Sequence, residues 1–134
     1  MLVVIFTQVQ AQKIKDKDVP ANVMSAFGKS YPTVKNANWQ KTSNGFEVSY
    51  DKDEMERNTS YDANGNLIEN RTKIMASGLP IAATDYMKKN HKDHKIKETY
   101  RTTDASENAG YKAKIKGLDL YFDANGNFVK SVKD

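Results

Sequence analysis

The chain changes between helical and strand periodicity, and the same order of segments occurs twice. Between residues 19 and 31 apolar side chains recur at helical spacing: Val19, Val23, Met24, Phe27 and Tyr31. Pro20 lies in the first turn, where a helix needs no amide hydrogen. A second segment of this kind begins at Pro80 and extends towards Asn90. Each segment predicts one amphipathic helix.

After each predicted helix the apolar period shortens to two, which indicates strands with one buried face. The clearest alternating segments are 45–50, 110–115 and 118–122, and earlier strands are expected at about 37–42 and 96–102. Segments rich in Gly, Asn and Ser separate the strands and predict turns. Each unit is therefore a helix followed by about four antiparallel strands, whose sheet has one face for the helix and one for solvent.

The two units are copies of one another. The pentapeptide DANGN occurs at 62–66 and again at 123–127, a shift of 61 residues. The helical segments align with a shift of 60, and GFEVSY at 45–50 aligns with GYKAKI at 110–115 with a shift of 65. The repeats are expected at 19–70 and 79–131, within a single domain covering 19–134. The sequence thus predicts an α+β fold built by tandem duplication.

DANGN can be considered as a calcium loop or as a turn. In an EF-hand loop the glycine is the sixth residue and a glutamate closes the loop at the twelfth. Gly65 and Gly126 are instead fourth, counted from Asp62 and Asp123. This spacing fits a type I turn followed by a glycine in the left-handed region, with the aspartate bonding nearby backbone amides.

The first residues of the chain resemble a targeting segment. Residues 1–11 carry the apolar stretch 2–6 and end at Ala11, where small or apolar residues precede the charged stretch KIKDKD. We interpret this segment as an incomplete signal peptide, followed by a polar linker at 12–18, and the alternative is an N-terminal strand. The expected location is accordingly periplasmic or secreted, without stable insertion into a membrane.

Composition adds limits on function. The 134 residues carry a net charge of +4, and the excess lies in the second half: residues 71–134 hold 13 basic and 8 acidic side chains, against 5 and 7 in residues 19–70. A basic surface can bind anions, but no nucleic-acid motif accompanies it. Cysteine is absent, which excludes disulfides and thiolate chemistry. We expect no nucleic-acid partner, and the sequence does not indicate the oligomeric state.

The order of short motifs resembles a known family. VPANVMSAFGKSYP, NWQK, NGFEVSY and YDANGNLIE in the first half, and GYKAKI and LYFDANGNFV in the second, are similar to the repeats of β-lactamase-inhibitor-like, PepSY-like secreted bacterial proteins. The resemblance covers nearly all of 19–129. It implies two helix-plus-four-strand units whose strands form one curved sheet with the helices on one face. No inhibitory contact residue matches a motif here.

No pattern predicts catalysis. A nucleophile elbow, a P-loop, a dinucleotide fingerprint and an HExxH pair are absent. His91 and His94 could share a face near the end of the second helix, but a pair on a lysine-rich surface usually only titrates. We therefore expect no enzymatic activity, no cofactor and no metal site.

The remaining candidate is a binding surface. Alternation places Glu47, Ser49, Lys112, Lys114 and Tyr121 on the solvent face of the sheet, and the charged stretch containing Asp51 and Asp53 forms a candidate recognition loop. The sequence predicts an exported, non-catalytic binding or inhibitor-like module that docks an exported or envelope protein on this face. Tyr121 would supply an aromatic anchor and the lysines would select an acidic partner. The alternatives are a small-ligand or ion-binding protein using a groove between the repeats, and a structural spacer.

Overall fold

A single antiparallel sheet runs through the whole molecule. The computed structural model describes residues 12–133, and this part of the chain contains nine strands that neighbour one another in chain order. The strands are β1 (Gln12–Ile14), β2 (Asn38–Thr42), β3 (Gly45–Lys52), β4 (Met55–Tyr61), β5 (Leu67–Ile74), β6 (Glu98–Asp104), β7 (Ala109–Ile115), β8 (Leu118–Asp123) and β9 (Phe128–Lys133). Helix α1 (Ala21–Ser30) precedes β2, and helix α2 (Ile81–Asn90) precedes β6. The α+β fold with a curved sheet is confirmed.

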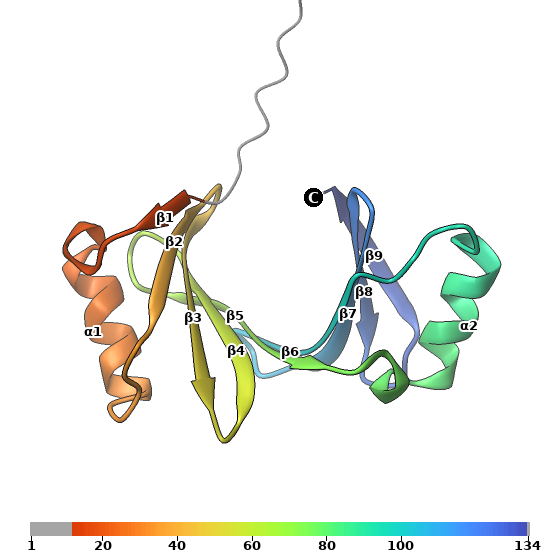
Figure 1. Cartoon of the computed structure of the whole chain (residues 1–134), viewed down its shortest axis with the longest axis horizontal. Coiled ribbons are helices and arrows are strands. Elements are labelled where there is room, and N and C mark those ends of the chain that lie inside the picture. The colour runs from red at the N-terminus through yellow and green to blue at the C-terminus, as the bar shows by residue number, and fades with distance from the viewer. Residues whose placement is uncertain (1–11, 134) are drawn as a thin grey trace, which may run out of the picture.

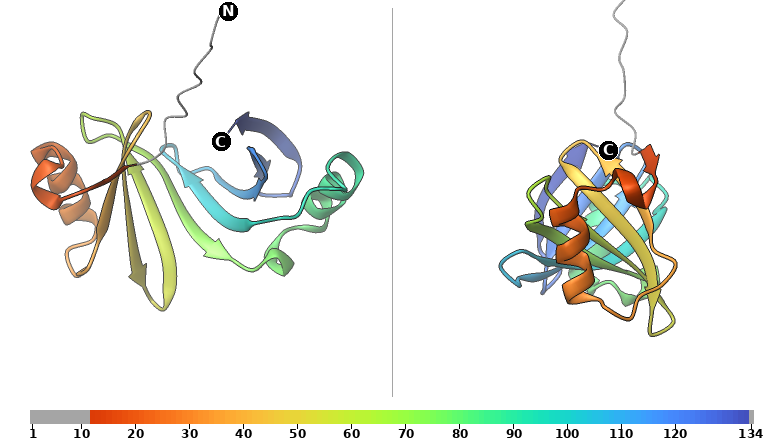
Figure 2. Two further views of the ribbon diagram at one scale, coloured as in Figure 1. Left: turned by 45° about the horizontal axis from the view of Figure 1, so that its top comes forward. Right: turned by 90° about the vertical axis from the view of Figure 1, so that its left-hand side faces the viewer.

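The sheet is bent so that its two halves face each other across a hollow. Figure 1 shows α1 and α2 at opposite ends of the molecule, both on the outer side of the bent sheet. The oblique view in Figure 2 shows the same arrangement, with the bend near β5 and β6. The helices therefore cover the convex face, and the concave face is left for other contacts.

The first core forms where α1 packs on β2 to β4. Pro20 precedes the helix, and Val23 and Phe27 are its buried side chains. Aromatic rings surround Phe27: its ring centroid lies 5.5 Å from that of Trp39 and 5.2 Å from that of Tyr50. Edge-to-face contacts of this kind add to the stabilisation from burial alone. The expectation that Trp39 belongs to the core is confirmed, since it is 2% exposed.

The second core has the same plan with smaller side chains. Ala83 and Met87 of α2 replace Val23 and Phe27, and they pack on β7 and β8. The fully buried residues on the strands include Ala113 and Leu120. The two cores are separate clusters, so the continuous sheet is what joins the halves.

Strand β5 belongs to both units. Its end pairs with β6 through Thr72↔Arg101, Lys73↔Tyr100 and Ile74↔Thr99. Strand β1 pairs with β2 in the equivalent way, through Gln12↔Lys41, Lys13↔Gln40 and Ile14↔Trp39. Each of these pairs corresponds to a β5–β6 pair whose residue numbers are 60 higher. Residues 12–18, expected to be a polar linker, thus form β1 and a 3₁₀ turn because their backbone completes the edge of the sheet. The predicted signal peptide, residues 1–11, lies outside the described residues.

The DANGN turns dock against the helix of their own unit. Gly65 and Gly126 have φ angles of 85° and 88°, as the turn interpretation expected. A Cβ atom on Gly65 would lie 2.8 Å from the carbonyl oxygen of Asn22 at the start of α1. A Cβ atom on Gly126 would lie 2.6 Å from Cβ of Pro80, just before α2. Glycine is required at both positions by conformation and by space.

In the described part of the chain, neither helix is long and apolar enough to cross a membrane.

Candidate functional site

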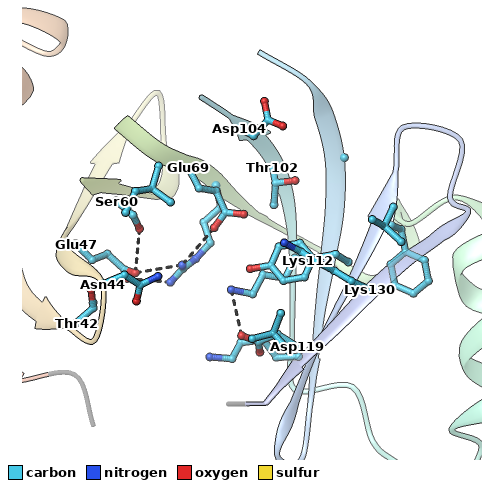
Figure 3. A pocket seen from close by; sticks show the side chains of 18 of the residues that line it. Thr42, Asn44, Glu47, Ser60, Glu69, Thr102, Asp104, Lys112, Asp119 and Lys130 are labelled. Carbon is cyan, nitrogen blue, oxygen red and sulfur yellow. Dashed lines mark hydrogen bonds and ion pairs between the residues drawn. The ribbon is translucent and has the colours of Figure 1, made fainter. Parts of the chain in front are cut away.

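The concave face of the sheet encloses an open hollow of about 1520 Å³. Side chains from both units line it, among them Gln40, Glu47 and Glu69 on one wall and Lys112, Asp119 and Lys130 on the other. Figure 3 shows Glu47 and Glu69 on one side of the hollow and Lys112, Asp119 and Lys130 on the other. The hollow therefore joins the two repeats in one continuous surface.

An ion pair between β3 and β5 forms the floor on the side of the first unit. Arg71 donates from its two terminal nitrogens to the Glu47 carboxylate, at 3.2 Å to Oε2 and 2.8 Å to Oε1. Glu69 lies 4.0 Å from the same guanidinium, and the Ser60 hydroxyl donates to Glu47 at 3.4 Å. Such a bidentate pair fixes the orientation of both planar groups.

A second ion pair forms the floor on the side of the second unit. Nζ of Lys112 lies 3.3 Å from Oδ2 of Asp119, and both side chains are largely buried. The ring of Tyr121 lies between two lysines, with Nζ of Lys112 5.3 Å and Nζ of Lys130 5.0 Å from its centroid. Cations at this distance from an aromatic ring are attracted to it. The charged groups of the floor are thus held by one another.

Burial changes the acid–base behaviour of two groups on this floor. Loss of hydration raises the pKa of Glu69 above its ordinary value, although the nearby charges of Lys112 and Arg71 act in the opposite direction. Loss of hydration is also the main reason that the pKa of Tyr121 is raised, and the carboxylate of Glu69 adds to it. Tyr121 is therefore a neutral hydrogen-bonding group at physiological pH.

The structure brings four of the seven predicted site residues to the hollow. Glu47, Lys112, Lys114 and Tyr121 line it, as strand alternation indicated. Ser49 is engaged elsewhere, because its hydroxyl donates to Oδ1 of Asn58 at 2.6 Å.

Asp51 and Asp53 do not line the hollow. The charged stretch containing them was expected to form a longer loop than its counterpart in the second unit, and this expectation is wrong; its role in recognition stays a prediction. Strand β3 continues to Lys52 and β4 begins at Met55, so only Asp53 and Glu54 form the turn, both with positive φ. Strands β3 and β4 have 8 and 7 residues, against 7 and 6 in β7 and β8, so this hairpin is longer in its strands and not in its turn. Asp53 lies 3.7 Å from Arg57.

Sequence reasoning missed Arg71, Glu69, Asp119 and Lys130. Asp119 was recognisable, because it alternates with Leu118 and Leu120 and so shares a face with Tyr121. Arg71 was not recognisable from the sequence, since its partner Glu47 is 24 residues away. The two meet only because of how β3, β4 and β5 pair with one another.

The two histidines lie close to each other just after α2. The rings of His91 and His94 lie 5.8 Å apart, and no group of three His, Asp or Glu side chains in residues 12–133 could hold an ion. Aspartates of the turns are occupied as well: Oδ1 of Asp62 accepts the amides of Asn64 and Asn66 at 2.9 and 3.0 Å.

Comparison with known proteins identifies the repeats. The sequence profile of the family described as "Putative beta-lactamase-inhibitor-like, PepSY-like" matches residues 5–69 and again residues 58–130. The chain belongs to this family. The two matches overlap along β4 and β5, the region where one PepSY-like unit passes into the next. No curated protein matches the sequence.

Solved structures share the fold of this PepSY-like protein. A DUF2874 family protein from Bacteroides ovatus superposes with a TM-score of 0.68 at 15% identity, covering 87% of this chain and 89% of that chain. A "BLIP-like protein" from Bacteroides fragilis gives 0.63 at 20% identity, covering 85% and 86%. A structure from Bacteroides eggerthii described under "putative periplasmic proteins" gives 0.65 at 11% identity, covering 86% and 88%. These identities are too low to carry more than the fold.

Proposed function

We propose that this PepSY-like protein is an exported, non-catalytic binding protein that holds a protein partner in its concave hollow. The observation that carries the proposal is the hollow itself, which is formed by both repeats and floored by two fixed ion pairs. Its volume of about 1520 Å³ exceeds the roughly 300–1,000 Å³ of ordinary small-molecule sites. An open surface of this size suits a protruding part of another macromolecule.

The rigidity of the floor supports binding by surface complementarity. The Arg71–Glu47 and Lys112–Asp119 pairs hold their groups before a partner arrives, so less conformational freedom is lost on binding. The family description and the Bacteroides fragilis relative both refer to a β-lactamase inhibitor, which accords with an inhibitor-like mode of action. The relative described as periplasmic, together with the signal-like residues 1–11, supports export.

Site-specific photo-crosslinking tests this function. A benzoylphenylalanine is placed at Gln40 or Val129, which line the hollow, and in a matched control at Ile81, which is 79% exposed on α2. In the cells that make the protein, we expect a discrete crosslinked species from both hollow positions and none from position 81. Equal crosslinking at position 81, or crosslinking there alone, would reject the hollow as the binding surface.

A small polar ligand in the same hollow is the second candidate. The observation that favours it is the concentration of polar groups from both repeats on one floor, including Glu69, Lys112 and Tyr121. Thermal-shift screening separates the candidates, because a ligand at about 100 times its Kd raises stability by about 2.7 kcal/mol. Stabilisation by a small compound that is lost in Lys112→Met would favour this candidate.

A further inference from the structure

The hollow is electrostatically divided between its two walls. On the wall of the second unit, four exposed lysines line it: Lys97 just before β6, Lys116 in the β7–β8 turn, and Lys130 and Lys133 on β9. We call these four residues the lysine rim. None of them has an ion-pair partner within residues 12–133, whereas the buried Lys112 is neutralised by Asp119.

The wall of the first unit has a different character. Four neutral hydrogen-bonding side chains belong to it: Gln40, Thr42, Ser43 and Asn44. It also carries Glu47 and Glu69, which share the single guanidinium of Arg71. The lysines that line the hollow therefore all lie on the wall of the second unit.

We infer that the hollow accepts an acidic loop of a partner protein, with the carboxylates of the loop turned towards the lysine rim. The inference rests on the proposed function and adds the chemistry and the orientation of the partner. The opposite side of the loop then meets Gln40, Thr42 and Asn44, which can bond backbone groups of either polarity. Charge complementarity of this kind steers association and excludes partners with the wrong sign.

A protein loop fits this surface better than a polyanion does. Nucleic acids and sulfated polysaccharides carry charge along their whole length and need a continuous basic track. Here Glu47 and Glu69 on the facing wall, and Asp104 at the end of β6, would repel them. Exposed apolar side chains also lie beside the lysines, with Val129 59% and Val132 43% exposed. Apolar contact next to charge is typical of protein interfaces.

Phage display of disulfide-closed, seven-residue random loops tests the inference with the full chain as bait. We expect the selected loops to be enriched in Asp and Glu. Their affinity should fall at least about tenfold in Lys97→Glu/Lys116→Glu/Lys133→Glu, a change that reverses three rim charges and leaves the buried floor intact. The matched control is Lys15→Glu/Lys29→Glu/Lys35→Glu, which changes net charge equally at exposed positions outside the hollow.

Each outcome decides the matter. Retained affinity in the control together with its loss in the rim variant supports the inference. Selected loops without acidic enrichment, or equal losses in both variants, overturn it. Heparin or duplex DNA competing at the same rim as strongly as the acidic loops would also overturn it, in favour of a polyanion site. Neutral or basic loops that crosslink to Gln40 and Val129 would leave the proposed function standing and reject the acidic partner alone.

Discussion

At the scale of the residue, one turn geometry is used three times. The DANGN turns at 62–66 and 123–127 are joined by a third at 104–108, which reads DASEN. In all three, Oδ1 of the first aspartate accepts the amides of the third and fifth residues at 2.9 to 3.0 Å. The sequence revealed two of them because they are identical. The third shares only its Asp, Ala and Asn, so the geometry is specified by the first and last residues.

The fourth residue of each turn adopts a left-handed backbone conformation. Gly65 and Gly126 touch the start of a helix, whereas Glu107 adopts the same left-handed conformation, with φ of 64°, although it carries a side chain. We expect Glu107→Gly to raise stability by up to about 1 kcal/mol by relieving this strain, and Gly126→Ala to lower it by about 2 kcal/mol. Urea unfolding of both variants measures the difference. A loss of stability in Glu107→Gly would show that the glutamate makes a compensating contact.

The turn aspartates also predict how stability depends on pH. Hydrogen bonds from the backbone amide of the fifth residue are the main reason that the pKa values of Asp62, Asp104 and Asp123 are lowered. A carboxylate whose pKa is lowered in the folded state stabilises that state fully at pH values above its ordinary pKa of 3.8. The stabilisation is lost as the pH falls through the lower pKa of the folded state.

The triple variant Asp62→Asn/Asp104→Asn/Asp123→Asn keeps an accepting oxygen in each turn. We expect it to be less stable than the parent at neutral pH and to approach the parent as the pH falls below 3.8 and the parent carboxylates become protonated. Thermal unfolding between about pH 2 and 7 gives the comparison, and carboxyl NMR titration gives the pKa values. A difference in stability that is independent of pH would assign the effect to altered turn geometry.

At the scale of the element, strand alternation predicted the faces correctly and the contacts across strands only in part. The alternation along 45–50 and 118–122 placed Glu47 and Tyr121 on the solvent face, where they line the hollow. The pairing of Glu47 with Arg71 could not be read from the same pattern. It depends on the register β3–β4–β5 and on a bulge between Ser60 and Tyr61, which shifts the pairing by one residue.

The Arg71–Glu47 pair should be costly to break and inexpensive to replace. Arg71→Met leaves the Glu47 carboxylate largely buried without its counter-ion, and we expect a loss of about 3 kcal/mol. The double variant Arg71→Met/Glu47→Gln removes the unpaired charge and should recover most of this loss. Urea unfolding of the two single variants and the double variant completes a double-mutant cycle. Additive losses would mean that the pair contributes no coupling and that the floor is fixed by packing alone.

At the scale of the whole molecule, duplication produces a sheet without a seam. The joint between the units, β5 with β6, contains six residue pairs from Glu69↔Asp104 to Ile74↔Thr99, as many as β7 with β8 inside the second unit. The duplication was visible in the sequence. The sequence did not show that β5 ends one unit and begins the next. Strand β1 is the first-unit counterpart of the end of β5, but it lies in a polar stretch without strand alternation. The polar stretch becomes a strand through pairing with β2.

Continuous pairing predicts that the two halves unfold together although their cores are separate. Trp39, the one tryptophan of the chain, lies in the first core and reports on it by fluorescence. Leu120 is fully buried in the second core, and Leu120→Ala should cost about 2–5 kcal/mol there. We expect Leu120→Ala also to lower the unfolding midpoint reported by Trp39, because loss of the second unit exposes the edge of β5.

Phe27→Ala, a destabilising change in the first core itself, gives the reference shift in the Trp39 midpoint. A Trp39 midpoint that stays at the parental value in Leu120→Ala would show that the units unfold independently, and the hollow would then be formed by two halves able to move against each other.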